Sequence, residues 1–176
     1  MYGGRGATHA AARQSATPRA GIEIQAYVRA VLLPQVVADV ARRNEIFQLS
    51  TFNYEKYGKP YVVNGPYFSI SHCKDGIAVV INDTPIGIDI ESIRRVNEDL
   101  IERVMNKDEI RLIANSQQLT ADRVFTRLWT QKEAIVKAQG TGIVSFEQLQ
   151  KTLDNGHWTL DTFESEKYIY SIAYKS

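Results

Sequence analysis

Two short stretches of the chain carry residues whose types and spacing are suited to catalysis. The first is GIDIE, in which Asp89 and Glu91 lie two residues apart. Side chains of a strand alternate between its two faces, so both carboxylates would share one face. Two carboxylates held that close repel each other unless protons or a cation lie between them. A hard cation such as Mg²⁺ fits that position, because it binds one or two carboxylates together with phosphate oxygens and water.

The second stretch is WTQKEAIVKAQGTG, which is predicted to form a helix that ends at its glycines. Trp129, Glu133 and Lys137 follow one another at intervals of four residues, so they form one stripe along this helix. Lys132 flanks the stripe. The simpler interpretation is a surface Glu–Lys pair that contributes about 0.2–0.5 kcal/mol, with the indole in the core. For either stretch taken alone, a solvated polar face is the preferred interpretation.

Two further polar residues precede these stretches. His72 ends the alternating strand YFSISH, and Lys59 lies in the turn YGKP. Taken singly, each is more typical of a structural or solvent-exposed position than of a functional site. Cys73 is the only cysteine of the sequence, which excludes an internal disulfide and a cysteine-rich zinc site and fits a reducing compartment.

Length and composition limit the classes of function. A chain of 176 residues accommodates one domain or two small lobes that share a core. An apolar fraction of 44% and a charged fraction of 23% are typical of a globular protein, and the formal net charge of +1 gives no argument for nucleic-acid binding. No apolar run approaches the roughly 20 residues of a membrane span, and no secretory signal is recognised. We therefore expect a cytoplasmic protein without nucleic-acid or membrane partners.

The elements that must position these residues are expected in an α+β order. Segment 22–44 has the apolar spacing of a helix, interrupted at Pro34. The expected strands lie near 46–52, 67–72, 77–81, 85–91, 157–163 and 167–174, and two further helices lie near 97–115 and 120–139. Strands and helices that follow one another in blocks indicate an α+β fold.

Taken together and in this order, YGKP, FSISH, GIDIE and WTQKEAIVK resemble the 4'-phosphopantetheinyl transferases of the large, Sfp type. The resemblance extends from about residue 47 to residue 142. The helix also resembles that of the small holo-acyl-carrier-protein synthases, whose GID strand lies near the start of the chain. Here about 85 residues precede that strand. This order favours the large type, in which two similar α/β lobes form a pseudodimer within one chain.

The resemblance implies an enzyme, a 4'-phosphopantetheinyl transferase with holo-acyl-carrier-protein synthase activity. Such an enzyme transfers 4'-phosphopantetheine from coenzyme A to a serine of an acyl or peptidyl carrier protein and releases adenosine 3',5'-bisphosphate. By this resemblance, Asp89, Glu91 and Glu133 would hold Mg²⁺ against the pyrophosphate, whose charge a metal must draw off. Glu133 or Glu91 would act as the general base toward the serine hydroxyl.

The basic residues of the motifs would bind the anionic substrate. By the same resemblance, Lys137 would neutralise the leaving phosphate during catalysis, and Lys132 would support the phosphates nearby. His72 would contact a phosphate of coenzyme A, and Lys59 would lie beside the adenine or the 3'-phosphate. Arginines and lysines between residues 94 and 111 form a cluster that suits an acidic carrier protein.

The resemblance does not extend to the N-terminal region. Residues 1–19 form an atypical arm rich in Ala and Arg, for which a transit peptide and an ordinary Ala-rich segment are both open interpretations. Residues 20–84 are expected to form a shortened first lobe, and residues 85–176 the second lobe with the metal motif. Without an opening strand, the first lobe would expose a sheet edge that is covered by the arm or paired between two chains, which makes the protein a monomer or a dimer.

Two other interpretations remain open at the level of the sequence. The alternative function is an inactive paralogue that binds coenzyme A or a carrier protein without turnover. The alternative assembly is a homotrimer of the small type, in which neighbouring chains build the site together.

Overall fold

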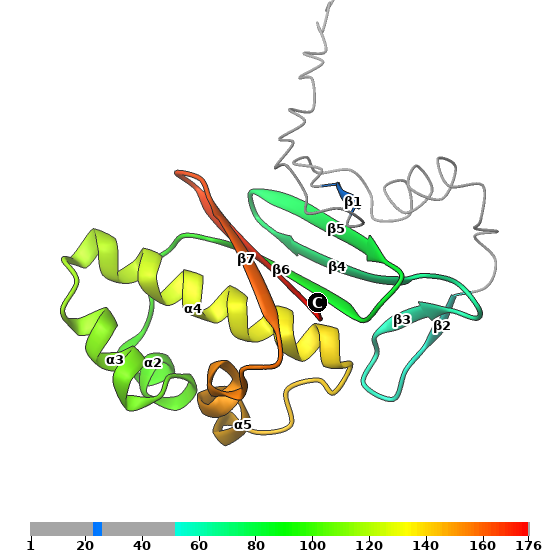
Figure 1. The fold of residues 1–176 in the computed structure, drawn as a ribbon. Helices are drawn as coiled ribbons and strands as arrows, with labels where there is room; N and C mark the ends of the chain where they lie inside the picture. Colours follow the sequence, from blue (N-terminus) through cyan, green and yellow to red (C-terminus); the bar gives the residue numbers. More distant parts are fainter. Residues whose placement is uncertain (1–22, 26–51, 176) are drawn as a thin grey trace, which may run out of the picture.

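The computed structural model describes residues 23–25 and 52–175 (Figure 1). The strands are β1 (Glu23–Gln25), β2 (Phe52–Tyr54), β3 (Pro60–Val62), β4 (Tyr67–Cys73), β5 (Gly76–Asn82), β6 (Ile86–Ser92), β7 (Thr159–Glu164) and β8 (Tyr168–Tyr174). The helices are α2 (Glu98–Val104), α3 (Lys107–Ala114), α4 (Gln118–Gln139), α5 (Phe146–Lys151) and the 3₁₀ helix η1 (Thr152–Asn155). This order confirms the predicted α+β class. No helix in the described ranges is long and apolar enough to cross a bilayer.

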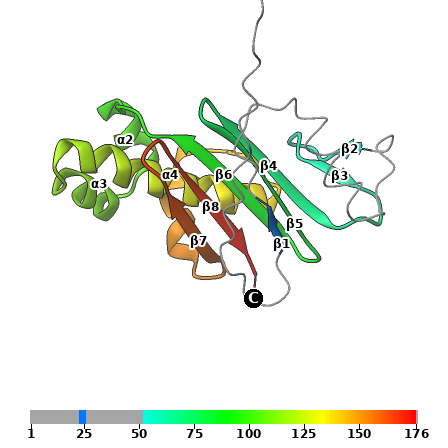
Figure 2. The same ribbon diagram turned by 90° about the horizontal axis from the view of Figure 1, so that it is seen from above.

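Two three-stranded antiparallel sheets form the centre of the structure. One has the strand order β1-β5-β4, and the other has the order β6-β8-β7. Strands β4 and β5 form a hairpin, in which Cys73 pairs with Gly76 across a two-residue turn. Strands β2 and β3 form a separate hairpin around the predicted YGKP turn. Figure 2 shows α2 and α3 at one end of α4 and this hairpin toward the other.

Helix α4 packs across β6 and β8, and this contact sets the distance between the strand and helix that carry the candidate residues. Gly87 and Asp89 share one face of β6, because strand side chains alternate. A Cβ atom at Gly87 would overlap the carbonyl oxygen of Ala134 and the amide nitrogen of Ala138. The helix backbone therefore lies directly on the strand backbone, one step from Asp89. The opposite face of β6 is fully buried through Ile86, Ile88 and Ile90.

Two serine side chains join the sheets where β4 runs beside β6. The Ser69 hydroxyl oxygen accepts a hydrogen bond from the Ile88 amide at 3.1 Å, and the Ser71 hydroxyl oxygen accepts one from the Ile90 amide at 3.2 Å. Strand β6 is an edge strand of its own sheet, and an edge strand leaves amides without a strand partner. The serines satisfy these buried amides, so β4 and β6 form one continuous surface.

The predicted helix at 97–115 is divided into α2 and α3. Met105 is buried at the break, and Asn106 begins the second helix. The Asn106 side chain accepts hydrogen bonds from the amides of Asp108 and Glu109, while the Glu109 carboxylate accepts one from the Asn106 amide at 2.7 Å. This is a capping box, which begins a helix and so ends the one before it.

Helix α5 is absent from the sequence prediction, because six residues are too few to show a helical apolar pattern. Its start is defined by Ser145, whose hydroxyl accepts a hydrogen bond from the Gln148 amide at 3.1 Å. Leu149 of this helix is fully buried among residues of α2, α3 and α4. This packing holds α5 beneath α4 (Figure 1).

The N-terminal prediction needs one correction. The segment beginning at Ile22 was expected to be helical and to leave a sheet edge open. Residues Glu23–Gln25 instead form β1, which pairs antiparallel with β5, with Ile24 opposite Val80. An edge with unpaired amides favours an added strand over a helix at these positions. The rest of the expected helix and the arm 1–19 lie outside the described residues, and the division into lobes stays a prediction.

We predict that Gly87→Ala lowers the free energy of unfolding by about 3 kcal/mol, since the new methyl group would displace the backbone of α4. Urea denaturation measures this loss. Gly156→Ala is the matched control, because Gly156 has φ of 36° but open space around it. Its expected loss is about 1 kcal/mol, from backbone strain alone. Equal losses for the two variants would contradict the close approach of strand and helix.

Candidate active site

The centre of the candidate site is an ion pair between β6 and α4. The Lys137 ammonium lies 2.6 Å from Asp89 Oδ1 and 3.0 Å from the Ser71 hydroxyl. Ser71 donates a further hydrogen bond of 2.8 Å to the same carboxylate oxygen. Asp89 is 3% exposed, so its charge depends on these partners rather than on water. Three elements, β4, β6 and α4, thus meet at a single carboxylate oxygen.

The second oxygen of this carboxylate has a different environment. Asp89 Oδ2 is buried and has no hydrogen-bond partner among the described residues. A buried polar atom without a partner costs free energy and calls for an explanation. A cation that approaches the carboxylate from this side would remove the cost.

Two glutamates lie within electrostatic reach of Asp89. Burial, with a smaller contribution from the neighbouring Asp89 carboxylate, raises the pKa of Glu133 to about 7 although the Lys137 ammonium acts in the opposite direction. Burial also raises the pKa of Glu91, with Asp89 acting in the same direction and Arg94 in the opposite one. Burial is the largest cause of both shifts and repulsion by Asp89 adds to it, so the three carboxylates lie close enough to influence one another. The spacing of the motifs therefore brings the three predicted carboxylates into one electrostatic group.

The donor set of this group fits Mg²⁺. It offers carboxylate oxygens alone, which a hard divalent cation prefers, and one of them is the buried Asp89 Oδ2. In the described part of the chain, however, no three such side chains already stand in the arrangement of a metal site. We attribute this to Lys137, whose ammonium is the cation that Asp89 binds here. Metal binding would require the carboxylates to turn toward a common point.

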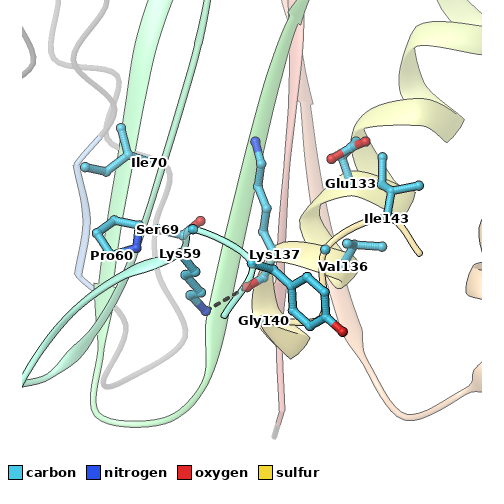
Figure 3. A pocket seen from close by; sticks show the side chains of 12 residues that line it. Lys59, Pro60, Ser69, Ile70, Glu133, Val136, Lys137, Gly140 and Ile143 are labelled. Carbon is cyan, nitrogen blue, oxygen red and sulfur yellow. Dashed lines mark hydrogen bonds between the residues drawn. The ribbon is translucent and has the colours of Figure 1, made fainter. Parts of the chain in front are cut away.

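A pocket of about 380 Å³ lies beside these groups, between the β2–β3 hairpin, β4 and the C-terminal half of α4 (Figure 3). Glu133 and Lys137 line it from the helix, and Lys59 lines it from the hairpin. The Lys59 ammonium donates a hydrogen bond of 2.6 Å to the Lys137 carbonyl oxygen. Burial lowers the pKa of Lys59, and the Glu55 carboxylate opposes this shift. The rest of the lining is largely apolar and includes Ile143.

The other two predicted ligands of coenzyme A lie elsewhere. His72 is exposed on β4 and does not line this pocket. Lys132 is fully buried, and its ammonium lies 2.9 Å from Glu109 Oε2 and 2.6 Å from the Leu149 carbonyl oxygen. Adjacent residues of a helix point about 100° apart, so Lys132 is turned away from Glu133. This placement corrects the prediction that Lys132 lies beside the phosphates.

Three residues of the site were missed or left without a role by the sequence analysis. Ser69 and Ser71 were read only as the polar positions of an alternating strand, yet they bond β6 and, in the case of Ser71, Asp89. Trp129 was assigned to the helix stripe, and its side chain lies near enough to Glu91 to oppose the rise in the pKa of that carboxyl group. The signal for the serines is their position, since two small hydroxyl residues alternate with the apolar residues Phe68 and Ile70 in a strand that precedes the carboxylates in the chain.

The segment that carries this group of residues is similar to a known protein family. Residues 85–174, which include β6 and α4, match the model of the 4'-phosphopantetheinyl transferase superfamily. The chain belongs to this superfamily. The match confirms the resemblance that the motifs predicted, and the α+β architecture is consistent with the fold of these transferases.

Curated 4'-phosphopantetheinyl transferases are among the similar proteins. Psf-1 of Bacillus pumilus is 35% identical over 94 residues, which are 52% of this chain and 40% of that protein. Gsp of Aneurinibacillus migulanus is 34% identical over 92 residues, 52% of this chain and 39% of that protein. Sfp of Bacillus subtilis (strain 168) is 33% identical over 95 residues, 52% of this chain and 42% of that protein. The chain thus spans about two fifths of the length of these relatives.

We predict that Glu133 makes stability fall as the pH rises. Its pKa is about 7 in the folded chain against 4.5 in the unfolded chain, so between these values the folded state binds more protons. The cost above pH 7 is roughly 3 kcal/mol, since the shift of about 2.5 pKa units corresponds to about 1.4 kcal/mol per unit. Glu133→Gln has no such proton and should gain stability over the wild type across this window.

Urea denaturation from pH 4.5 to pH 8, without divalent cations, measures the difference. Glu147→Gln is the matched control, because Glu147 is exposed and its pKa is lowered by Lys151. A constant difference between Glu133→Gln and the wild type over this pH range would show that Glu133 titrates normally.

Proposed function

We propose that this protein transfers 4'-phosphopantetheine from coenzyme A to a serine hydroxyl of a carrier protein and releases adenosine 3',5'-bisphosphate. The observation that carries the proposal is the grouping of Asp89, Glu133 and Lys137 at the edge of a pocket, within the segment that matches the family. The names of the relatives, all 4'-phosphopantetheinyl transferases, support the same reaction.

The pocket has the chemistry to hold part of coenzyme A. Its lining combines apolar side chains with two ammonium groups, those of Lys59 and Lys137. Apolar walls suit a base or a pantetheine arm, and the ammonium groups suit phosphates. His72 is exposed on the neighbouring β4 strand, outside the pocket. It could contact a phosphate of the ligand only if the bound ligand extended beyond the pocket.

Asp89, Glu91 and Glu133 are the residues that would hold Mg²⁺. When bound, this ion would neutralise the pyrophosphate and so favour departure of the bisphosphate. The buried, partnerless Asp89 Oδ2 and the raised pKa values of both glutamates support this assignment.

The proton transfer is assigned to Glu133. Glu133 lines the pocket beside Lys137, so its carboxylate can face the hydroxyl of an incoming serine. In the proposed step, Glu133 takes the proton of the serine hydroxyl, and the serine oxygen bonds to the phosphorus that carries pantetheine. The bond from that phosphorus to the bridging oxygen breaks, and this oxygen leaves with adenosine 3',5'-bisphosphate. The Lys137 ammonium would meet the charge that develops there, while Glu91 remains the second candidate base.

The partner would be an acyl or peptidyl carrier protein. Arg94, Arg95 and Arg103 are exposed at or near the end of β6 and on α2, and Leu112 is 53% exposed on α3. Exposed basic residues on α2 and before it, together with an exposed apolar side chain on α3, suit an acidic helical partner. The surface lies at the end of α4 away from the β2–β3 hairpin (Figure 2).

We predict that Asp89→Asn and Glu133→Gln each reduce transfer at least ~100-fold, since each removes a carboxylate that the reaction needs. Intact mass of apo acyl and peptidyl carriers, incubated with coenzyme A and Mg²⁺, measures the product. Glu147→Gln is the control, because it removes an exposed carboxylate of α5. Wild-type binding of coenzyme A without any transfer would instead support the inactive paralogue.

We also predict that Arg103→Glu/Arg111→Glu slows transfer strongly at low salt and weakly at high salt, because exposed charges mainly set the association rate. The fold should tolerate both changes, since the Arg111–Asp108 ion pair is exposed and contributes little. Steady-state rates over a series of salt and carrier concentrations test this. Lys175→Glu is the control, because it reverses an exposed charge that directly follows the C-terminal end of β8, away from α2 and α3. It should not slow transfer at low salt. Equal slowing at all salt concentrations would refute docking on this surface.

A further inference from the structure

Lys132 makes a buried contact that the proposed reaction does not use. Its ammonium binds Glu109 Oε2 at 2.9 Å and the Leu149 carbonyl oxygen at 2.6 Å, and its side chain is 0% exposed. We call Lys132, Glu109 and the Leu149 carbonyl the helix clasp. Burying a charged group away from water costs free energy unless the group is paired and hydrogen-bonded. The members of the helix clasp are therefore held closely in position.

The helix clasp joins three helices. Lys132 belongs to α4, Glu109 to the first turn of α3, and Leu149 to α5. The oxygen of Glu109 that binds Lys132 also closes the capping box of α3. The side chain of Asn106, at the same cap, donates a hydrogen bond of 3.3 Å to the Gln150 carbonyl oxygen. The start of α3 and the end of α5 are therefore held to the middle of α4 at one point.

The segment between α4 and α5 forms part of the pocket wall. It leaves α4 at Gly140 and enters α5 after Ser145, and Gly140, Gly142 and Ile143 line the pocket. The Lys132–Leu149 hydrogen bond spans the two helices that flank this segment. The helix clasp thus fixes the α5 end of the wall relative to α4, whose own last turn holds the other end at Gly140, although Lys132 itself is buried away from the pocket.

We propose that Lys132 is a positioning residue for coenzyme A binding, which it supports by holding segment 140–145 through the helix clasp. The proposal rests on the proposed function only in naming coenzyme A as the ligand. In this proposal, the lysine of the WTQKEA motif affects the pocket without contacting the phosphates of the ligand.

The test uses Lys132→Met, Glu109→Gln and the double variant in the full chain. Lys132→Met leaves the Glu109 carboxylate buried without its cation, and Glu109→Gln leaves the ammonium without its anion. The double variant leaves neither charge, while Gln at 109 retains an oxygen for the capping box and the Leu149 carbonyl still accepts from the Thr152 amide. Removing both charges of a buried pair is far less harmful than removing one.

Two measurements are made on each variant. Hydrogen exchange of segment 140–145 in the ligand-free chain reports the pocket wall, with β8 as the reference for global opening. Calorimetry with coenzyme A reports ligand binding. Lys151→Met is the matched control, because it breaks the exposed Lys151–Glu147 pair of α5. It should change neither measurement.

We expect each single charge removal to speed exchange in segment 140–145 about tenfold, to leave β8 protected, and to raise the Kd of coenzyme A about tenfold, a change of ~1.4 kcal/mol. The double variant should return both values most of the way to those of the wild type. If Lys132→Met fails to fold, Glu109→Gln and the double variant still decide the matter.

Three results would overturn the proposal. The first is unchanged exchange of segment 140–145 in folded single variants. The second is a folded double variant that binds coenzyme A as weakly as Lys132→Met, which would mean direct contact with the ligand. The third is wild-type behaviour of Glu109→Gln. A wild-type chain that does not bind coenzyme A would refute the proposed function, while the exchange data would still decide whether the helix clasp holds the wall.

Discussion

The candidate site depends on the contact of three elements at Asp89 Oδ1. The carboxylate belongs to β6. Ser71 of β4 donates a hydrogen bond to this oxygen, and the Lys137 ammonium of α4 forms an ion pair with it. Each partner is far from the others in the chain, and the carboxylate is almost fully buried. Loss of either donor would leave a buried charge with too few partners, which is among the most costly defects in a folded protein. The same contact therefore holds the sheets to the helix and positions the groups at the pocket edge.

A second constraint is the burial of further carboxyl groups around this contact. Burial and repulsion by Asp89 raise the pKa values of Glu133 and Glu91, and the opposing effect of Lys137, joined by Arg94 at Glu91, does not offset them. Such strain has no advantage for folding, since apolar residues at these positions would pack without it. Buried ionisable groups that lower the stability of the fold are typical of sites that bind or convert a ligand. The proposed Mg²⁺ would relieve part of this cost.

Much of this arrangement can be predicted from the sequence, because it follows from periodicity. Alternation in GIDIE places Asp89 and Glu91 on one face, and the spacing of four places Glu133 and Lys137 on one stripe. The spacing of residues predicts the side of a strand or helix on which each side chain lies. It does not predict whether that side faces solvent or packs against another element. Lys132 shows the difference, since only the packing of α3 and α5 against α4 makes its position a buried one.

Contacts between distant segments account for the other differences. The roles of Ser69 and Ser71 require knowing that β4 lies beside β6, which no local pattern reveals. The strand β1 exists because the edge of β5 is available to it, whereas its own residues also fit the start of a helix. Local propensity was overridden at these positions by the pairing partner, as is common for short strands.

The ammonium groups of the pocket have a further consequence for selectivity. Lys59 is engaged by the Lys137 carbonyl, and Lys137 by Asp89, so both bind the protein itself while no ligand is present. These oxygens already offset part of the charge on each ammonium, so an anion gains only the difference between what it offers and what it weakens or displaces. Inorganic phosphate and other small anions offer little beyond charge and gain little from the exchange. A large ligand that also fills the apolar lining has more to contribute, so a pocket built in this way would favour such a ligand over simple anions.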